Sequence, residues 1–363
     1  MIERGHNPHH ALPLLRRLFQ QPDSFFDGES WTAGLSLPKA LIAALRENPL
    51  RSSSVVRRHE SADGTVKLLI EFEDGQAVES VLMAADHPER AAACLSSQVG
   101  CAMGCGFCAS TKNGLKRNLT AGEIVEQYLH LHAVAKTTNR RIANIVFMGM
   151  GEPMHNLDSV MAAIERITDR DVGSIGKRHV TVSTVGIVDG IDRLAASGLR
   201  THLALSLHAP DDETRAKLVP MNRKYGVDEI MAAARRYQTA TGRIVIIEYC
   251  LLAGINDSDE QALKLVELLD GVRMHVNLIP YNVIAGVEYR RPSRERINRF
   301  LTLVRTGAVS HLRKTRGDEV AAACGQLAVR RVTEPGPVDL QTNGEQARDS
   351  TELAEVRLNV IAG

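Results

Sequence analysis

Three cysteines in the stretch CLSSQVGCAMGCGFC could bind one metal centre together. Cys101, Cys105 and Cys108 have the spacing CxxxCxxC, which brings three thiolates within reach of a single centre. A structural zinc site is closed by four ligands, commonly in two pairs, and no further cysteine follows at a comparable spacing. Three cysteines instead leave one iron of a [4Fe–4S] cluster without a protein ligand, so that this iron can bind a small molecule. We therefore interpret the three as ligands of such a cluster.

Other interpretations of the same cysteines stay open at this point. One is a zinc site completed by His130 or His132, and another is a set of buried, unreactive thiols. Clustered cysteines in an intracellular protein indicate metal binding or catalysis more often than structural disulfides. Cys250, inside the apolar run RIVIIEYCLL, is predicted to be a buried core thiol.

The composition is that of a globular protein. The 363 residues are 44% hydrophobic and 24% charged, with a formal net charge of +1. No run approaches the roughly 18 apolar residues of a membrane helix, and MIERGHNPHHALPLL has no apolar signal core. We therefore expect a cytoplasmic protein with no membrane partner. Residues 334–363 hold six acidic residues and two arginines, so the chain before them carries +5, and its basic clusters could contact a phosphate backbone or simply be solvated.

The elements that must position the cysteines alternate along the chain. Residues 1–60 are predicted to be a small N-terminal accessory region, helical in LPLLRRLF and SLPKALIAALREN. VKLLIEFEDG and AVESVLM predict two strands joined by a turn at Asp74 and Gly75. After the cysteines, apolar β-branched runs alternate with amphipathic helical stretches, the first of which opens with a capping box of Thr120 and Glu123. Residues 333–363 lose this periodicity and are predicted to be a mobile acidic tail.

A strand followed by a helix, repeated about six times, indicates parallel strands with right-handed crossovers. We predict a TIM-like full or partial (β/α) barrel over residues 61–332, with a doubly wound open sheet as the alternative. Both architectures bind ligands at the carboxyl ends of the strands. The strand-like runs end in polar or glycine-rich residues at GMGEP (149–153), STVG (183–186), SLHAP (206–210) and PYN (280–282).

Several of these stretches resemble a known family. CxxxCxxC ahead of a strand and helix repeat, with GMGEP after the next strand, resembles the radical S-adenosylmethionine superfamily. CLSSQVGCAMGCGFCASTKNGLKRNLTAGEIVEQ, FMGMGEPMHN, VTVSTVGI, LALSLHAPDDETR, VNLIPYN and RKTRGDEVAAACGQL resemble the RlmN/Cfr family of RNA adenine methyltransferases, over about residues 79–327. RKTRG and NLIPYN look more like RlmN, which methylates C2 of adenine, than like Cfr, which methylates C8.

This resemblance implies a methyltransferase that acts on ribosomal RNA, transfer RNA or both, as a monomer. It implies a [4Fe–4S] cluster and two S-adenosylmethionine molecules per turnover, one to methylate Cys324 and one to generate a 5′-deoxyadenosyl radical. The radical would remove a hydrogen from the S-methyl group, and the resulting carbon radical would add to the base. Glu79 would accept the ring proton, and Cys94 would then form a transient disulfide with Cys324 that an external reductant resets.

The resemblance also implies a set of residues that contact S-adenosylmethionine. These residues match the family at the predicted strand ends, and they are Gly151, Glu152, Ser183, Ser206, Leu207, His208 and Asn282. The glycines of GMGEPM alone form only a partial dinucleotide-binding pattern, because the third glycine is missing.

Three features depart from the family pattern. The first fifty residues are shorter than its N-terminal domain, Ala321 stands where an acidic residue is usual, and the acidic tail is longer than the family needs. These departures keep two alternatives in view. One is the same radical chemistry on adenine C8 or on another RNA, and the other is a non-catalytic, zinc-stabilised RNA-binding module.

Overall fold

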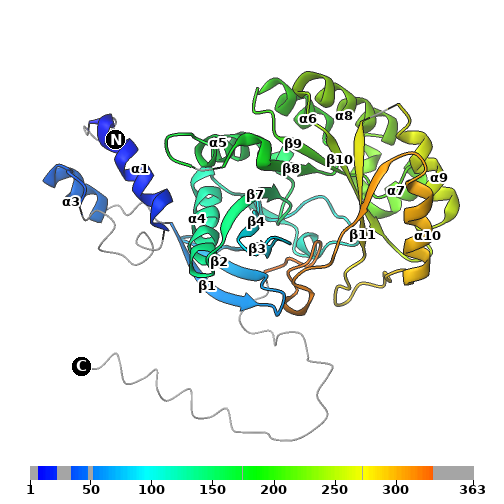
Figure 1. Cartoon of the computed structure of the whole chain (residues 1–363), viewed down its shortest axis with the longest axis horizontal. Helices are drawn as coiled ribbons and strands as arrows, with labels where there is room; N and C mark the ends of the chain where they lie inside the picture. The colour runs from blue at the N-terminus through cyan, green and yellow to red at the C-terminus, as the bar shows by residue number, and fades with distance from the viewer. Residues whose placement is uncertain (1–6, 23–33, 48–51, 174, 272, 330–363) are drawn as a thin grey trace, which may run out of the picture. The chain divides into compact units, whose positions relative to one another are not determined.

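A ten-stranded sheet forms the centre of the molecule, in strand order β1-β2-β3-β4-β7-β8-β9-β10-β11-β12 (Figure 1). The computed structural model describes residues 7–22, 34–47, 52–173, 175–271 and 273–329. The strands are β1 (Ser53–Glu60), β2 (Val66–Phe72), β3 (Ala77–Ala84), β4 (Arg90–Cys94), β7 (Arg141–Phe147), β8 (Val180–Thr184), β9 (His202–Ser206), β10 (Val245–Leu251), β11 (Met274–Pro280) and β12 (Val309–Leu312).

The sheet has an antiparallel part and a parallel part. β1 to β4 pair antiparallel, whereas β4, β7, β8, β9, β10, β11 and β12 pair in parallel. Parallel strands need long crossovers, and helices supply them here. Among the described residues β1 and β12 end the strand order without pairing to each other. The predicted barrel is therefore confirmed in its partial form.

Helices follow the parallel strands and cover the sheet (Figure 1). They are α4 (Ala121–Thr137), α5 (Leu157–Ile167), α6 (Val188–Ala196), α7 (Asp212–Leu218), α8 (Val227–Thr241), α9 (Asp259–Leu268) and α10 (Arg294–Val304). The central strands β9 and β10 bury almost every apolar side chain, such as Leu203 and Ile247 at 0% exposure, whereas Val309 and Leu312 of the edge strand β12 are exposed. Burial on both faces explains why β9 and β10 appear in the sequence as unbroken apolar runs. No helix in the described part of the chain is long and apolar enough to cross a membrane.

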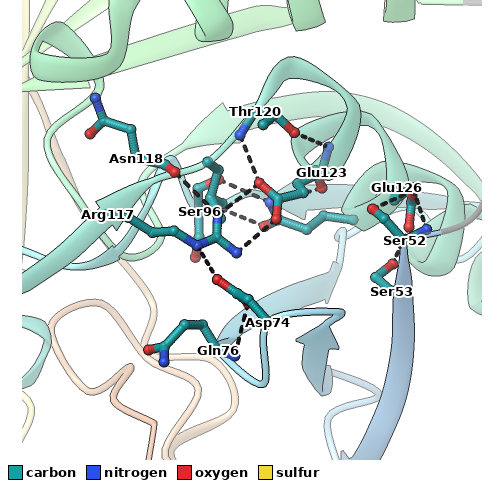
Figure 2. A network of polar contacts seen from close by, with 12 residues as sticks. Ser52, Ser53, Asp74, Gln76, Ser96, Arg117, Asn118, Thr120, Glu123 and Glu126 are labelled. Carbon is teal, nitrogen blue, oxygen red and sulfur yellow. Dashed lines mark hydrogen bonds and ion pairs between the residues drawn. The ribbon is translucent and has the colours of Figure 1, made fainter.

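Two local predictions are confirmed. The capping box of α4 forms as expected, because Glu123 N–H donates to Thr120 Oγ1 at 3.2 Å and Thr120 N–H donates to Glu123 Oε2 at 2.7 Å (Figure 2). The β2–β3 turn has Gly75 at φ +73°, and Gln76 N–H donates to Asp74 Oδ1 at 3.0 Å. Asp74 also binds Arg117, which in turn pairs with Glu123, so the turn is tied to the start of α4 (Figure 2).

The N-terminal region contains the predicted helices α1 (Ala11–Gln20) and α3 (Lys39–Glu47). Phe19 of α1 packs on Tyr128 of α4, with 5.8 Å between ring centroids. β1 also falls before the predicted boundary at residue 60, yet it is the edge strand of the main sheet. The boundary stays a prediction, and the predicted tail at 333–363 lies outside the described residues.

Candidate active site

Two cavities lie at the carboxyl ends of the parallel strands, and Cys324 lines both. The first, the thiol cavity, has a volume of about 410 Å³ and is lined by Cys94, Cys324, Asn282 and the segment 312–316. The second, the cluster cavity, has a volume of about 150 Å³ and is lined by Cys101, Cys105, Cys108, residues of GMGEP and several strand ends. The structure thus brings Cys94 and Cys324, which are 230 positions apart in the sequence, to the same cavity.

The three cysteines of CxxxCxxC lie on the loop between β5 (Gln98–Gly100) and β6 (Leu115–Asn118). Burial raises the pKa of each thiol, that of Cys101 to about 12, and the charges of Cys101 and Cys108 raise the pKa of Cys105 further. All three cysteines line the cluster cavity, which brings them around one space. A cluster must therefore supply the positive charge that makes all three thiolates stable.

The donor set fits an iron–sulfur cluster better than a zinc ion. Within the described ranges, no three His, Cys, Asp or Glu side chains gather tightly enough to hold a metal ion as they stand. A four-iron cluster is larger than one ion, so its ligands stand farther apart. The zinc alternative is not supported, because His130 bonds to Ser53 at 3.0 Å and neither His130 nor His132 lines the cluster cavity.

The glycine loop of GMGEP brings a carboxylate to the cluster cavity. Gly151 has φ +101°, and a Cβ there would lie 2.6 Å from Gln98 Cβ, so only glycine fits. Glu152 is held by Val185 N–H at 2.9 Å and Met154 N–H at 3.0 Å. Burial raises the pKa of Glu152 to about 7. It makes no ion pair within the described residues, and a ligand's ammonium group would supply the missing counter-charge.

A buried polar network fixes this loop to β3 and α4. Ser96 Oγ accepts from Met150 N–H at 2.8 Å and donates to Glu79 O at 2.7 Å. Gln127 of α4 accepts from Ser96 N–H at 2.9 Å and from Ser80 Oγ at 2.7 Å. Each of these buried polar groups has a partner, which keeps the loop in one conformation.

His208 presents a defined tautomer to the cluster cavity. It has φ +61°, and its Nδ1 accepts from Cys250 N–H at 3.0 Å, so Nε2 carries the proton. Burial lowers the pKa of His208 to about 3, and its ring packs edge-on against Phe107 with centroids 4.6 Å apart. The neutral ring can therefore donate a hydrogen bond to a ligand.

The other predicted cofactor contacts separate into two groups. Ser183 and Ser206 line the cluster cavity, with 3.4 Å between their Oγ atoms. Leu207 is fully buried and lines neither cavity, and Asn282 lines the thiol cavity, where its Nδ2 donates to Cys324 O at 3.1 Å. The contact roles of all seven residues stay predictions.

Cys94 and Cys324 share the thiol cavity. Cys94 ends β4 and is buried, and burial followed by the charge of Cys324 raises its pKa to about 12. Cys324 is exposed to solvent, although desolvation by its surroundings raises its pKa, and the positive charge of Arg313 opposes the shift at both thiols. Both cysteines are free thiols in this structure. Arg313 lines the same cavity as both thiols, and its positive charge favours their thiolate forms.

Glu79 lies apart from both cavities. It belongs to β3, where Lys67 Nζ lies 2.9 Å from its Oε1 and Ala328 N–H donates to its Oε2 at 2.9 Å. Its predicted role as a proton acceptor stays a prediction.

Three cavity residues were not foreseen from the sequence. Cys250 is buried as predicted. It does not only pack in the core, because it also lines the cluster cavity. Glu248 lines the same cavity and lies 4.0 Å from Arg313, which lines the thiol cavity. The strand-end rule could have found Cys250, the residue before the last of β10, whereas Glu248 lies in the middle of that strand.

Comparisons with known proteins agree with this arrangement. Residues 95–266 match the model of the radical SAM superfamily. The chain is 48% identical to the probable dual-specificity RNA methyltransferase RlmN 1 of Opitutus terrae, over 91% of this chain and 94% of that protein. It is 44% identical to the probable dual-specificity RNA methyltransferase RlmN of Rhodopirellula baltica, over 91% and 87%. A crystal structure of a radical SAM methyltransferase from Sphaerobacter thermophilus superposes with a TM-score of 0.85 at 43% identity, covering 90% of this chain and 94% of that one.

Proposed function

Because the chain belongs to the RlmN family of radical S-adenosylmethionine RNA methyltransferases, we propose that it methylates C2 of adenine in ribosomal RNA, transfer RNA or both through Cys324. Its cofactors are a [4Fe–4S] cluster and S-adenosylmethionine. The observation that carries the proposal is the position of Cys324 on the boundary of both cavities. From there one sulfur can reach the cofactor on one side and a substrate base on the other.

The cluster cavity holds the cofactors. Cys101, Cys105 and Cys108 would bind the cluster, while Gly151 and Glu152 would bind the methionine amino group. When bound, the cluster supplies the electron that cleaves S-adenosylmethionine into methionine and a 5′-deoxyadenosyl radical. Ser183, Ser206 and the Nε2–H of His208 would orient the nucleoside part, since their polar atoms line the same cavity.

Cys324 and Cys94 form and break the covalent link to RNA. The Cys324 thiolate displaces the methyl group from one S-adenosylmethionine, forming a carbon–sulfur bond as the sulfonium bond breaks. After a hydrogen atom leaves that methyl group, its carbon adds to adenine C2, where no ordinary nucleophilic methylation can occur. The adduct would lose one electron, which the cluster can take back, and the ring proton, which Glu79 would accept. Attack of the Cys94 thiolate on the Cys324 sulfur would then break the carbon–sulfur bond and form a disulfide, and the released carbon would take up a proton to become the methyl group.

Glu79 is the proposed acceptor of the ring proton. Ala328 N–H occupies one of its oxygens and Lys67 the other. The segment after Cys324 therefore has to move before Glu79 can reach a base.

The substrate base must be unstacked, because C2 of adenine faces the interior of a helix. Arg313, Lys314 and Arg316 line the thiol cavity and would bind the RNA backbone there. We propose further that the protein works as a monomer in the cytoplasm. An external electron donor and a thiol reductant would reset the site.

The proposed function is tested by detecting the covalent link between Cys324 and RNA. Cys94→Ala should accumulate a Cys324–RNA adduct under anaerobic turnover, and the double variant Cys94→Ala/Cys324→Ala should form none. Mass spectrometry of nucleosides should show 2-methyladenosine with the unchanged enzyme. A product of 8-methyladenosine would contradict the C2 assignment, and methylation by Cys324→Ala would contradict the carrier mechanism.

A further inference from the structure

Arg215 is the most deeply buried charged residue beside the cluster cavity. It belongs to α7 and is 0% exposed. Its Nε donates to Leu207 O at 2.9 Å, its Nη1 to Asn222 Oδ1 at 2.8 Å, and its Nη2 to Ser206 O at 3.3 Å and also to Val185 O. Every one of these acceptors is a neutral carbonyl oxygen.

The guanidinium of Arg215 has no carboxylate partner within ion-pair distance among the described residues. Hydrogen bonds to carbonyl groups satisfy its donors, but they do not neutralise its charge. Burial lowers the pKa of Arg215 to about 10, which still leaves it charged at neutral pH. A buried cation without a directly paired anion is strongly unfavourable, and the charges that favour its charged form act from farther away, that of Cys105 more than that of Asp212.

The cysteine loop lies directly against α7. Gly106 N–H donates to Leu218 O, the last residue of α7, at 3.1 Å. A Cβ at Gly104 would come within 3.5 Å of Pro220, so the loop follows the residues after α7 closely. Arg215 and Cys105 also act on each other electrostatically, since the guanidinium opposes the effect of burial on the thiol's pKa.

We propose that Arg215 is a positioning residue that supplies the counter-charge of the [4Fe–4S] cluster and holds the strand ends around it. The proposal rests on the proposed function, because it requires that cluster. Three thiolates carry more negative charge than the oxidised cluster core carries positive charge, and reduction adds one more negative charge. A fixed cation beside the cluster therefore stabilises the reduced form more than the oxidised form. Its hydrogen bonds also join the ends of β8 and β9, where Ser183, Ser206 and His208 lie.

The experiment measures the reduction potential of the reconstituted cluster in Arg215→Gln, Arg215→Lys and the unchanged protein. Arg215→Gln, whose amide can still donate to a carbonyl, should shift the potential to a more negative value, and Arg215→Lys should stay closer to the unchanged protein. Arg243→Met is the matched control. Arg243 also donates to a backbone carbonyl, Arg200 O at 2.8 Å, but it precedes β10 at the opposite end of the strands, so its loss should leave the potential unchanged.

A second variant covers the case in which Arg215→Gln fails to fold. Asn222 Nδ2 donates to Asp212 Oδ1 at 2.9 Å, so Asp212→Asn/Asn222→Asp exchanges an amide and a carboxylate at the same net charge. This exchange gives Arg215 a carboxylate partner. It should raise the melting temperature of the cluster-free protein, reduce the gain in melting temperature on cluster loading, and make the potential more negative.

A full complement of iron with an unchanged potential in both Arg215→Gln and the exchange variant would overturn the proposal. If Arg215→Gln does not fold, the exchange variant alone decides. If the protein without substitutions bound no iron, the proposed function itself would be refuted. Iron analysis therefore distinguishes failure of the proposed function from failure of the role of Arg215.

Discussion

Lys67 and Glu79 form a buried ion pair between β2 and β3, with 2.9 Å between Nζ and Oε1, and each partner also binds one end of the segment that carries Cys324. Lys67 Nζ donates to Ala321 O at 3.1 Å, and Ala328 N–H donates to Glu79 Oε2 at 2.9 Å. The two side chains are only 9% and 10% exposed. One ion pair in the antiparallel part of the sheet therefore holds the proposed methyl carrier in place.

We expect Lys67→Met to loosen this segment. Lys67→Met removes the ion pair from the buried Glu79 carboxylate, which should lower the free energy of unfolding by about 3–5 kcal/mol. Cys324 should react faster with iodoacetamide, as peptide mapping by mass spectrometry can follow. Arg58→Gln is the control, because it breaks the exposed Arg58–Glu60 pair on β1 and should cost under about 1 kcal/mol. An unchanged rate at Cys324 would show that the pair does not restrain it.

Gly151→Ala should weaken the binding of S-adenosylmethionine. The added Cβ would lie 2.6 Å from Gln98 Cβ and 2.8 Å from Gln98 N, so the loop carrying Glu152 has to shift. Gly198→Ala is a matched control with φ +73° and nothing within 4 Å of its Cβ, and it should cost only about 1 kcal/mol of backbone strain. Calorimetric titration with S-adenosylmethionine compares the two. Equal affinities would mean that the loop accommodates the clash.

His208 should make the protein less stable in acid. Its pKa is lowered to about 3 by burial, whereas the unfolded chain has the ordinary value, so the unfolded state binds more protons between these two values. Stability is therefore lost as the pH falls below about 6.5, by about 2 kcal/mol at about pH 5 from this group alone. Urea unfolding of the cluster-free protein at about pH 7.5 and pH 5 measures the effect.

The contribution of His208 can be isolated with His208→Asn. Asparagine tolerates a positive φ, and its Oδ1 can accept from Cys250 N–H, so this variant should lose much of the pH dependence. His87→Asn, which replaces an exposed histidine, should keep it. If the free energy of unfolding fell equally with pH in His208→Asn, His87→Asn and the unchanged protein, His208 would not be the source of the acid sensitivity.

Gln127→Leu should destabilise the site without touching a cavity. It would leave Ser96 N–H and Ser80 Oγ, both fully buried, without their acceptor, at about 1–3 kcal/mol for each group. Gln238→Leu is the control, because Gln238 donates to Arg273 O at a partly exposed position and should change stability by under about 0.5 kcal/mol. Denaturant unfolding compares the two, and equal losses would contradict the role of this network.

The alternation of strands and helices, the turn at Gly75 and the capping box of Thr120 were all predictable from the sequence. Each depends on a local pattern of residue types, such as a hydrophobic period or a residue with a special backbone conformation. The family stretches also identified the five cysteines that the structure gathers around two adjoining cavities.

Other features were not predictable because they depend on partners that are distant in the sequence. Arg215 lies in the charged stretch DDETRAKL, which is typical of a solvated helix, and only the carbonyl groups of β8 and β9 explain its burial. Lys67 has the same property, because its partners are on the next strand and on a segment 254 residues away. β1 pairs with β2 although its side chains are mostly exposed, so its hydrophobicity gave no signal that it joins the main sheet.

The position of Cys324 on both cavities has a consequence for how the enzyme handles a reactive carbon. If Cys324 carries the methyl group as proposed, the one-carbon unit attached to its sulfur would reach both cavities from one side chain. It would not be released into solvent, so the distance it travels would be set by one covalent tether and not by diffusion. Cys324 could also carry only one carbon at a time, because its sulfur must become a free thiol again before it can be methylated a second time.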